Sequence, residues 1–522
     1  MYTHQGSLAP PVVIVGAGVG GLAAAIELAQ AGLEVTVVER ARVPGGKLRE
    51  LAVDGAWVDS GPTVLTMKWV FDELFAHAGA NLDERLSMTR AQVLARHAWS
   101  ESEKLDLFAD PARAADAIGD FAGAAAARGF QLFRQRASEV YKTLEHSFIR
   151  AQRTTPLELV RKAGGITELL RIKPFASLWS ELGNFFADPR LRQLFGRYAT
   201  YCGSSPFLAP ATLMLVAHVE LAGVWQVAGG MQRLPEAMAR LAIEKGVRFR
   251  CGETVRELVL ERGRIAGATL ASGERLPASA VVLNADASAL AEGLFGSASQ
   301  GAISKVPAAA RSMSALTLSM HAPVSGFALS RHNVFFGADY KAEFCDVMEH
   351  GRLPRAPTVY VCAQDRGDED AAQRSGAGEG APERLFCIIN APATGDRERL
   401  ERADIERCIQ SAMELLDRCG LQVLATPKSC LITTPSDFEQ RFPGTGGALY
   451  GRATHGSMAT FQRPGARTRI PGLYLAGGSV HPGPGVPMAA LSGRAAAQSL
   501  LADSRSTARS HPAAMHGGTS MP

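Results

Sequence analysis

Hydrophobic and polar positions along the first forty residues predict a strand, a turn, a helix and a second strand. A short apolar run ends at Val15, a glycine-rich turn covers residues 16–21, and an alanine-rich segment of helical length follows. A second apolar run, residues 33–38, ends at Glu39. Short apolar runs that alternate with a helix-length segment are typical of a βαβ unit in a parallel sheet.

The glycines of this turn predict a dinucleotide site. Gly16 permits a tight turn, Gly18 lets backbone N–H groups approach a pyrophosphate, Gly20 continues the turn, and Gly21 lets the helix pack closely on the sheet. The positive end of the helix then faces the phosphates. Glu39 stands where a carboxylate accepts hydrogen bonds from ribose hydroxyls and repels a 2′-phosphate, which disfavours NADP. A plain βαβ unit that binds no nucleotide is the alternative for this segment.

The periodicity of the remaining chain predicts two excursions from this nucleotide unit. Residues 93–99 and 104–108 indicate a hairpin, and residues 111–218 have helical spacing. A helix over 230–246 and strands over 247–250, 254–260 and 281–283 return to the nucleotide unit. The second excursion, about 300–435, contains strands over 358–362 and 385–389, a polar glycine-rich surface loop between them, and a helix over 397–418.

Two further glycine segments favour a flavin over a nicotinamide cofactor. The first, directly after the acidic residue, contains Arg40, Gly46 and Lys47, and Gly61-Pro62-Thr63 follows it. The second, near the other end of the chain, is a strand, a glycine-proline loop and a helix start, with the residues Gly478, Val486, Pro487 and Met488. The N-terminus of that helix can face an anionic flavin edge. A nicotinamide dehydrogenase needs neither segment.

These motifs together resemble the FAD-dependent amine-oxidase-like superfamily and, within it, the bacterial carotenoid (phytoene-type) desaturases. The resemblance covers nearly the whole chain and includes Gly229-Gly230-Met231 and the segment Val281 to Asp286, which contains Asn284. It implies an α/β fold with a Rossmann-like FAD-binding domain, an inserted mixed substrate domain and a helical membrane-facing region. In similar enzymes the backbone near the position of Val255 holds the adenine side. Lys47 stands where many relatives carry arginine, which implies a looser contact with phosphate or flavin.

The expected domain organisation follows from these boundaries. FAD-binding segments are expected over 1–90, 225–300 and 436–502. The substrate and membrane-facing helical region covers 91–224, and the substrate-domain insertion covers 301–435. Residues 503–522, rich in Ser, Ala, His, Gly and Pro, are expected to form a disordered tail.

The segment from Gly61 to Phe71 looks most like the branch of this family that acts on 1-hydroxylated acyclic carotenoids. The resemblance implies hydride transfer from C–H to flavin and a new 3,4 double bond, on the way to spheroidene- and spirilloxanthin-type pigments. Three alternatives stay open: a phytoene desaturase, an FAD amine oxidase, and a non-catalytic prenyl-lipid carrier similar to the Rab GDP-dissociation inhibitors. The electron acceptor is expected to be oxygen or a quinone, and no catalytic base is assigned.

Composition narrows the classes of partner. The 522 residues carry a net charge of only +4, without a long basic run, so nucleic acid is not expected as a partner. The eight cysteines form no CxxC pair and none lies in the C-terminal flavin segment, so FAD is expected to be non-covalent. No metal site is expected. We expect neither a signal peptide nor a membrane-spanning helix, and place the protein peripherally on the cytoplasmic face of a membrane.

A hydrocarbon substrate requires an apolar channel beside the flavin. The channel is expected between the two excursions, and the candidates for its lining, as a region and not singly, are Trp69, Phe71, Phe175, Trp179, Phe185, Phe186, Phe207, Met214, Trp225, Phe335 and Phe336. Phe175, with Lys162, Arg171 and Lys173 nearby, indicates an interfacial anchor. His481 lies in the C-terminal loop, where a structural turn position is as plausible as a role beside the cofactor.

Overall fold

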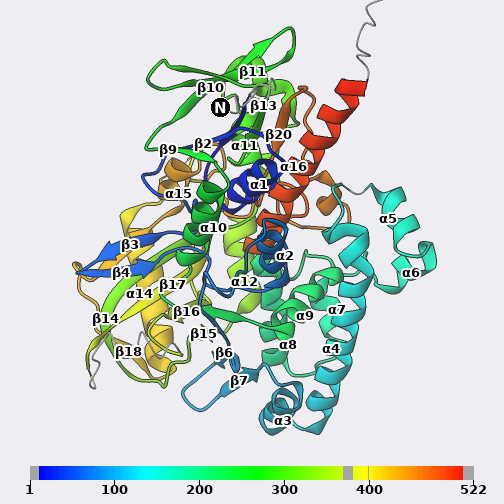
Figure 1. The fold of residues 1–522 in the computed structure, drawn as a ribbon. Coiled ribbons are helices and arrows are strands. Elements are labelled where there is room, and N and C mark those ends of the chain that lie inside the picture. The colour runs from blue at the N-terminus through cyan, green and yellow to red at the C-terminus, as the bar shows by residue number, and fades with distance from the viewer. Residues whose placement is uncertain (1–10, 154, 368–379, 398, 510–522) are drawn as a thin grey trace, which may run out of the picture.

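A five-stranded parallel sheet forms the centre of the computed structural model, which describes residues 11–153, 155–367, 380–397 and 399–509. The expected βαβ unit is present as β1, α1 and β2, and the strand order of the sheet is β20-β13-β1-β2-β9. The bounds are β1 Val12–Val15, α1 Val19–Gln30, β2 Val35–Glu39, β9 Arg248–Cys251, β13 Ala280–Leu283 and β20 Leu473–Leu475. Segments from both ends and the middle of the sequence therefore build one sheet (Figure 1).

Each face of this sheet is covered by apolar packing. Alternate strand residues such as Ile14 and Val37 face helix α1 and two helices that pack against α1, and the other set, such as Val13 and Val38, faces a three-stranded sheet. Burial on both faces explains why the central strands are continuous apolar runs. The covering elements are α10 Arg233–Glu244 and α16 Val486–Arg509 on one face, and β10 Val255–Glu261, β11 Arg264–Leu270 and β12 Arg275–Pro277 on the other.

A larger mixed sheet forms the second part of the fold. Its strands run in the order β18-β14-β17-β16-β15-β6-β7, and β19 also pairs with β14. The predicted hairpin is present as β6 and β7, and both strands predicted for the second excursion, β16 and β17, are present. The bounds are β6 Val93–Ala98, β7 Lys104–Phe108, β14 Ser314–Gly326, β15 His332–Phe335, β16 Val359–Ala363, β17 Pro382–Ala391, β18 Leu421–Val423 and β19 Cys430–Thr433. Helix α14, Arg402–Arg418, packs against this sheet.

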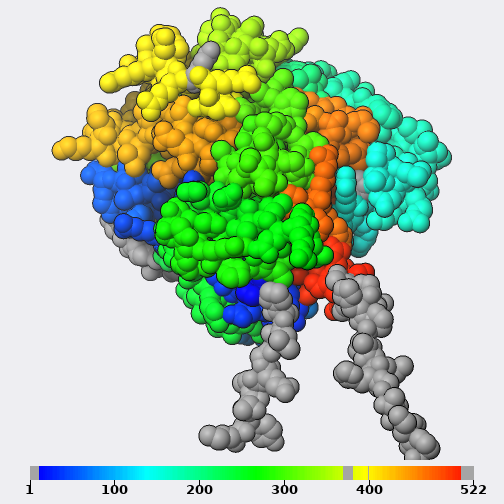
Figure 2. Space-filling view, turned by 90° about the horizontal axis from the view of Figure 1, so that it is seen from above, coloured from blue at the N-terminus to red at the C-terminus, as the bar shows by residue number. Residues whose placement is uncertain are grey.

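Helices fill the first excursion, as the spacing predicts, and surround a core of phenylalanines (Figure 1). The helices are α3 Pro111–Ala122, α4 Ala124–Leu144, α5 Pro156–Lys162, α6 Ile166–Arg171, α7 Leu178–Leu182, α8 Pro189–Gly196 and α9 Leu215–Ala222, with the 3₁₀ segments η2 Arg197–Cys202 and η3 Ala211–Met214. A π-helical turn, η1 Glu145–Ile149, extends α4. Helices α5 and α6 project from the body as a separate lobe, cyan at the edge of the molecule in Figure 2.

Smaller elements join these parts. They are the antiparallel pairs β3 Glu50–Val53 with β4 Ala56–Asp59 and β5 Met88–Arg90 with β8 Trp225–Val227, and the helices α2 Trp69–His77, α11 Ala287–Ala291, α12 Tyr340–Phe344 and α15 Pro435–Arg441. Across the described residues, no helix combines the length and the hydropathy that crossing a membrane requires.

The C-terminal boundary differs from the expectation. Helix α16 continues past residue 503, where the composition indicated a disordered tail, as far as Arg509. Packing explains the difference, because Leu500 is buried beside α1 and Asp503 accepts a hydrogen bond from the hydroxyl of Tyr474 at 2.9 Å. Residues 510–522 and most of the polar loop, 368–379, lie outside the described residues.

Candidate active site

A cavity of about 760 Å³ opens at the carboxyl ends of the parallel strands. Gly16 follows β1, Glu39 ends β2, Asn284 follows β13 and Gly478 follows β20 by a short turn, and all four residues line the cavity. This edge is where parallel α/β sheets bind their ligands. Because the strand ends are fixed by the sheet, the backbone around the cavity is held in place before a ligand binds.

The structure brings nearly all the predicted site residues together in this cavity. Gly21 is the exception, because it lies beneath the lining. Those that line the cavity are Gly16, Gly18, Gly20, Glu39, Arg40, Gly46, Lys47, Gly61, Pro62, Thr63, Val255, Asn284, Gly478, Val486, Pro487 and Met488. They come from the three chain segments that the sequence assigned to one nucleotide domain.

Two glycines of the first turn show how closely the backbone is packed. A Cβ atom on Gly21 would lie 2.1 Å from the carbonyl oxygen of Gly16, so only glycine lets α1 approach β1 this closely. A Cβ atom on Gly18 would lie 2.8 Å from Oδ1 of Asn284, across the floor of the cavity. Gly18 precedes α1 without a side-chain cap, which leaves the first N–H groups of that helix available to an anion.

Polar groups at the cavity match the parts of a dinucleotide. The Glu39 carboxylate accepts hydrogen bonds from the backbone N–H groups of Ala17 at 2.6 Å and Ala41 at 2.8 Å, and these bonds fix its position at the end of β2. Oδ1 of Asn284 is buried without a hydrogen-bond partner, as are both Nη atoms of Arg49. Buried polar atoms are normally satisfied, so these unpaired atoms suit a polar ligand in the cavity.

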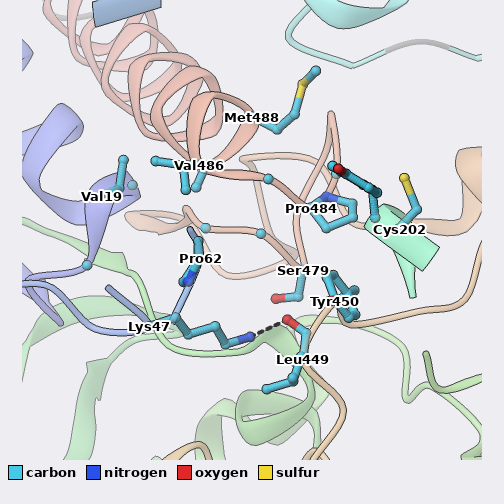
Figure 3. Close-up of a pocket in the computed structure, with 18 of the residues that line it drawn as sticks. Val19, Lys47, Pro62, Cys202, Leu449, Tyr450, Ser479, Pro484, Val486 and Met488 are labelled. Atoms are coloured by element: carbon cyan, nitrogen blue, oxygen red, sulfur yellow. Dashed lines mark hydrogen bonds between the residues drawn. The ribbon is translucent and has the colours of Figure 1, made fainter. Parts of the chain in front are cut away.

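Lys47 brings a buried amine to the site. Its Nζ donates a hydrogen bond to the carbonyl oxygen of Leu449 at 2.5 Å, the contact drawn as a dashed line in Figure 3. Burial lowers the pKa of Lys47, and Asp286 opposes that effect. The pKa of Arg49 is lowered to about 10, mainly by burial. An anionic ligand would stabilise the charged form of both residues.

Residues of the C-terminal loop form part of the cavity wall. Figure 3 shows Val486 and Met488 in the upper part of the view and Lys47 in the lower part, with Ser479 close to Leu449. His481 is not among the lining residues: its Nε2 lies 2.9 Å from the carbonyl oxygen of Ala151. Burial lowers the pKa of His481 to about 4, so the ring is neutral at pH 7 and can donate from Nε2. His481 therefore occupies a structural position in the loop, and its side chain does not line the cavity.

The other half of the cavity is apolar. Its lining comes from α4, η1, α5, α6, α9 and the mixed sheet, and includes Leu144, Phe148, Ile149, Leu159, Leu169, Ile172, Leu213, Val216, Val219, Val334, Phe386, Ile388 and Phe461. The region that the sequence indicated for the channel is not the one that lines the cavity, because none of its eleven candidate residues is among the lining residues. Five of them are buried in the core, where Phe186, for example, stacks on Phe195 at a ring-centroid distance of 4.7 Å, whereas Phe175 is exposed.

Sequence reasoning also missed a polar cluster in the apolar half. Arg197, Tyr201 and Glu220 line the cavity and contact one another. A signal was present, because Glu220 is the single carboxylate within the mostly apolar stretch 213–225, whose other polar side chain is His218. A buried carboxylate needs a partner. The partner of Glu220 is Arg197 of η2, and no rule of sequence spacing links the two residues.

Most of the chain matches a known family. A model described as flavin containing amine oxidoreductase matches residues 19–501. The chain belongs to this family. Its fold is that of a flavin enzyme, and its cofactor is FAD, which agrees with the glycine turn, the acidic residue after β2 and the unpaired polar atoms of the cavity. An oxidoreductase from Methanosarcina mazei has the same fold, with a TM-score of 0.59 at 17% identity over 94% of this chain and all of its own.

Two curated relatives are similar over nearly their full length. Hydroxyneurosporene desaturase of Rubrivivax gelatinosus is 51% identical over 98% of this chain and 96% of its own length. Hydroxyneurosporene desaturase of Cereibacter sphaeroides is 42% identical over 96% of this chain and 99% of its own. The similarity therefore covers both the cofactor half and the apolar half of the cavity.

Proposed function

We propose that this protein is an FAD-dependent desaturase of acyclic carotenoids that forms the 3,4 double bond of 1-hydroxycarotenoids such as 1-hydroxyneurosporene. The observation that carries the proposal is the single cavity that joins a dinucleotide cradle to a long apolar wall. The full-length relatives, both named for hydroxyneurosporene desaturation, support the same substrate class. Phytoene is the alternative substrate within the class.

The residues that line the cradle are proposed to hold FAD without a covalent bond. Backbone N–H groups of the turn from Gly16 to Gly20 and the start of α1 would hold the pyrophosphate, Glu39 would accept hydrogen bonds from the ribose, and the backbone at Val255 would hold the adenine side. Lys47 and the loop from Gly478 to Met488 would contact the flavin. Bound FAD supplies a two-electron acceptor for the hydride that leaves the substrate.

The apolar half is suited to a hydrocarbon. Carotenoids offer almost no hydrogen-bonding groups, so their binding depends on transfer of apolar surface from water to an apolar wall. The wall built by residues such as Phe148, Leu213 and Phe386 provides this surface and excludes water from the reacting carbon atoms. An oxidase of small amines would need a polar amine pocket, and a prenyl-lipid carrier would not need the intact cradle.

The lobe of α5 and α6 is proposed to rest on a membrane and to admit the substrate from lipid. Leu157 is 81% exposed and Phe175 is 77% exposed. Ile166 and Leu170 are also exposed in this lobe, and the basic residues Arg161, Lys162 and Arg171 lie among them in the sequence.

The other side of the same segment contributes to the cavity, which Leu159, Leu169 and Ile172 line. The segment thus presents one apolar side to the surroundings and another to the substrate space, which is the arrangement of an interfacial portal.

The electrons are proposed to pass from the enzyme to oxygen or to a quinone. Oxygen uptake measured beside quinone reduction, in the same liposome suspension, would separate these two acceptors. Lateral access through the α5–α6 lobe suits a lipid-soluble quinone, because it dissolves in the same membrane as the substrate.

Product analysis tests the proposed function. The FAD-loaded protein is incubated with liposomes that carry 1-hydroxyneurosporene in one sample and phytoene in another, and the carotenoids are separated by chromatography. We expect a red-shifted product, lighter by two hydrogens, from the hydroxylated substrate alone. Conversion of phytoene instead would place the enzyme at an earlier step. Conversion of neither, with FAD bound, would overturn the proposal and favour amine oxidation.

A further inference from the structure

The apolar half of the cavity contains a buried charged cluster that the hydrocarbon itself does not explain. Arg197 and Tyr201 come from η2, and Glu220 comes from α9. Nη2 of Arg197 donates to Oε1 of Glu220 at 3.2 Å, and Nη1 of Arg197 donates to the hydroxyl oxygen of Tyr201 at 2.9 Å. That hydroxyl donates to Oε2 of Glu220 at 2.5 Å. All three residues line the cavity.

Stability gives little reason to keep such a cluster in a hydrocarbon site. Arg197 is 6% exposed and Glu220 is 2% exposed. A buried ion pair commonly stabilises a fold no more than apolar residues of the same volume, because desolvation offsets the attraction. Nε of Arg197 is also buried, and among the described residues it has no hydrogen-bond partner. The cluster therefore has one unused donor, the N–H group at Nε of Arg197. A hydrocarbon would leave this donor unpaired, whereas an oxygen atom on the ligand would accept its hydrogen bond.

The protonation state of the cluster supports a role in binding. Burial opposes the charge on Arg197, but Tyr201 and Glu220 outweigh it, so the pKa of Arg197 is raised and the guanidinium stays charged. Burial raises the pKa of Tyr201, which stays a neutral phenol. The cluster thus offers fixed N–H donors together with phenol and carboxylate oxygens that can accept.

The cluster lies close to the cofactor half of the cavity. Residue Cys202 ends η2, directly after Tyr201, and Figure 3 shows Cys202 beside Pro484 of the C-terminal loop. A Cβ atom on the next residue, Gly203, would lie 2.4 Å from the ring of Tyr450, which lines the same end of the cavity. A ligand atom held by the cluster is therefore near the position where the reacting carbon atoms must meet the cofactor.

We infer that Arg197, Tyr201 and Glu220 bind the C1 oxygen of the carotenoid and so select oxygenated substrates and set which bond reacts. The inference rests on the proposed function. In a 1-hydroxycarotenoid the oxygen is three bonds from C3, so a group that holds it next to the cofactor also places C3 and C4 there. A site built to bond a hydroxyl discriminates strongly against the analogue without it, because the buried polar groups are then left unpaired.

Paired substrates test this inference with the FAD-loaded, full-length enzyme. We would measure kcat/KM in liposomes for 1-hydroxyneurosporene and for 1,2-dihydroneurosporene, which has hydrogen in place of the hydroxyl. The unmodified enzyme should prefer the hydroxylated substrate by about tenfold or more, the effect of one hydrogen bond to a charged group. Tyr201→Phe should reduce this preference severalfold, and the charge-neutral pair Arg197→Met with Glu220→Gln should abolish it.

Tyr198→Phe is the matched control. The Tyr198 hydroxyl donates to Oε1 of the same Glu220 at 2.6 Å, but this ring is not among the lining residues. Its removal should lower thermal stability as much as Tyr201→Phe and leave the substrate preference unchanged. Equal conversion of both substrates by the unmodified enzyme, which needs no variant to fold, would overturn the inference while the desaturase function stands. Conversion of neither substrate would instead refute the proposed function.

Discussion

Gly18→Ala tests whether the turn after β1 is a cradle for FAD. The backbone of Gly18 has φ −71° and ψ 171°, which alanine adopts without strain, so the fold should survive. The new Cβ atom would lie 2.8 Å from Oδ1 of Asn284, so the end of that side chain must move. The methyl group would also stand on the floor of the cavity, where the pyrophosphate must approach the backbone.

The expected loss follows from the hydrogen bonds that the methyl group would break. A hydrogen bond between a backbone N–H group and a charged phosphate contributes about 1.5–3 kcal/mol, and about 1.4 kcal/mol changes an affinity tenfold. Loss of one such bond should therefore weaken FAD binding by roughly ten- to a hundredfold. Titration of the apoprotein with FAD, followed by the quenching of flavin fluorescence, measures the dissociation constant.

Gly301→Ala provides the control for this measurement. Nothing lies within 4 Å of a Cβ atom built on Gly301, so this variant should bind FAD and unfold like the unmodified protein. Gly18→Ala apoprotein should unfold within about 1 kcal/mol of it, because only one side-chain end must shift. If Gly18→Ala bound FAD within twofold of the unmodified protein, the cradle would not be where we place it.

Three further predictions concern the ribose, the membrane and pH. Glu39→Gln should weaken FAD binding by about tenfold in the same titration, because a neutral amide accepts ribose hydrogen bonds more weakly. Leu157→Ser with Phe175→Ser should reduce co-sedimentation with anionic liposomes severalfold, whereas Leu424→Ser, which removes an apolar residue that is 64% exposed elsewhere on the molecule, should not. Burial lowers the pKa of His481 from its ordinary value of 6.5 to about 4 in the folded protein. Between these two pH values the unfolded chain binds a proton at His481 that the folded protein does not bind, so the stability of the fold decreases as the pH drops through this range. His481→Gln should flatten the dependence of unfolding free energy on pH there, in urea titrations, by at most about 1.4 kcal/mol per pH unit.

The cofactor half was predictable because its signals are local in the sequence. The spacing of Gly16, Gly18 and Gly21 after an apolar strand, with Glu39 at the end of the next, fixes one strand-turn-helix-strand geometry. The structure places Gly21 under the turn, where it lets α1 pack closely on β1, and places the other three residues in the lining of the cavity. Asn284, more than 240 residues later, was found only through the family resemblance, since no spacing rule links it to the turn.

The apolar half was not predictable because packing and channel lining have the same sequence pattern. Phe186 precedes α8 and Phe195 lies within it, and the two rings stack on each other in the core. Phe148 and Phe461 meet at the cavity from segments more than 300 residues apart. Hydrophobicity identifies buried positions but not which of two buried surfaces a side chain faces. Only the tertiary structure shows which buried side chains pack in the core and which line the cavity.

This difference has a consequence for how the enzyme's specificity can change. The cradle is made largely of backbone groups of the turns around Gly18 and Gly478, which most side-chain substitutions elsewhere leave in place. The substrate half is made of side chains, and its charge is concentrated in Arg197 and Glu220. Substitutions in the substrate half should therefore alter which carotenoid reacts while FAD binding is retained. Combined FAD titration and product analysis of the Arg197→Met, Glu220→Gln variant separates the two properties: an FAD affinity that fell together with the substrate preference would contradict the division.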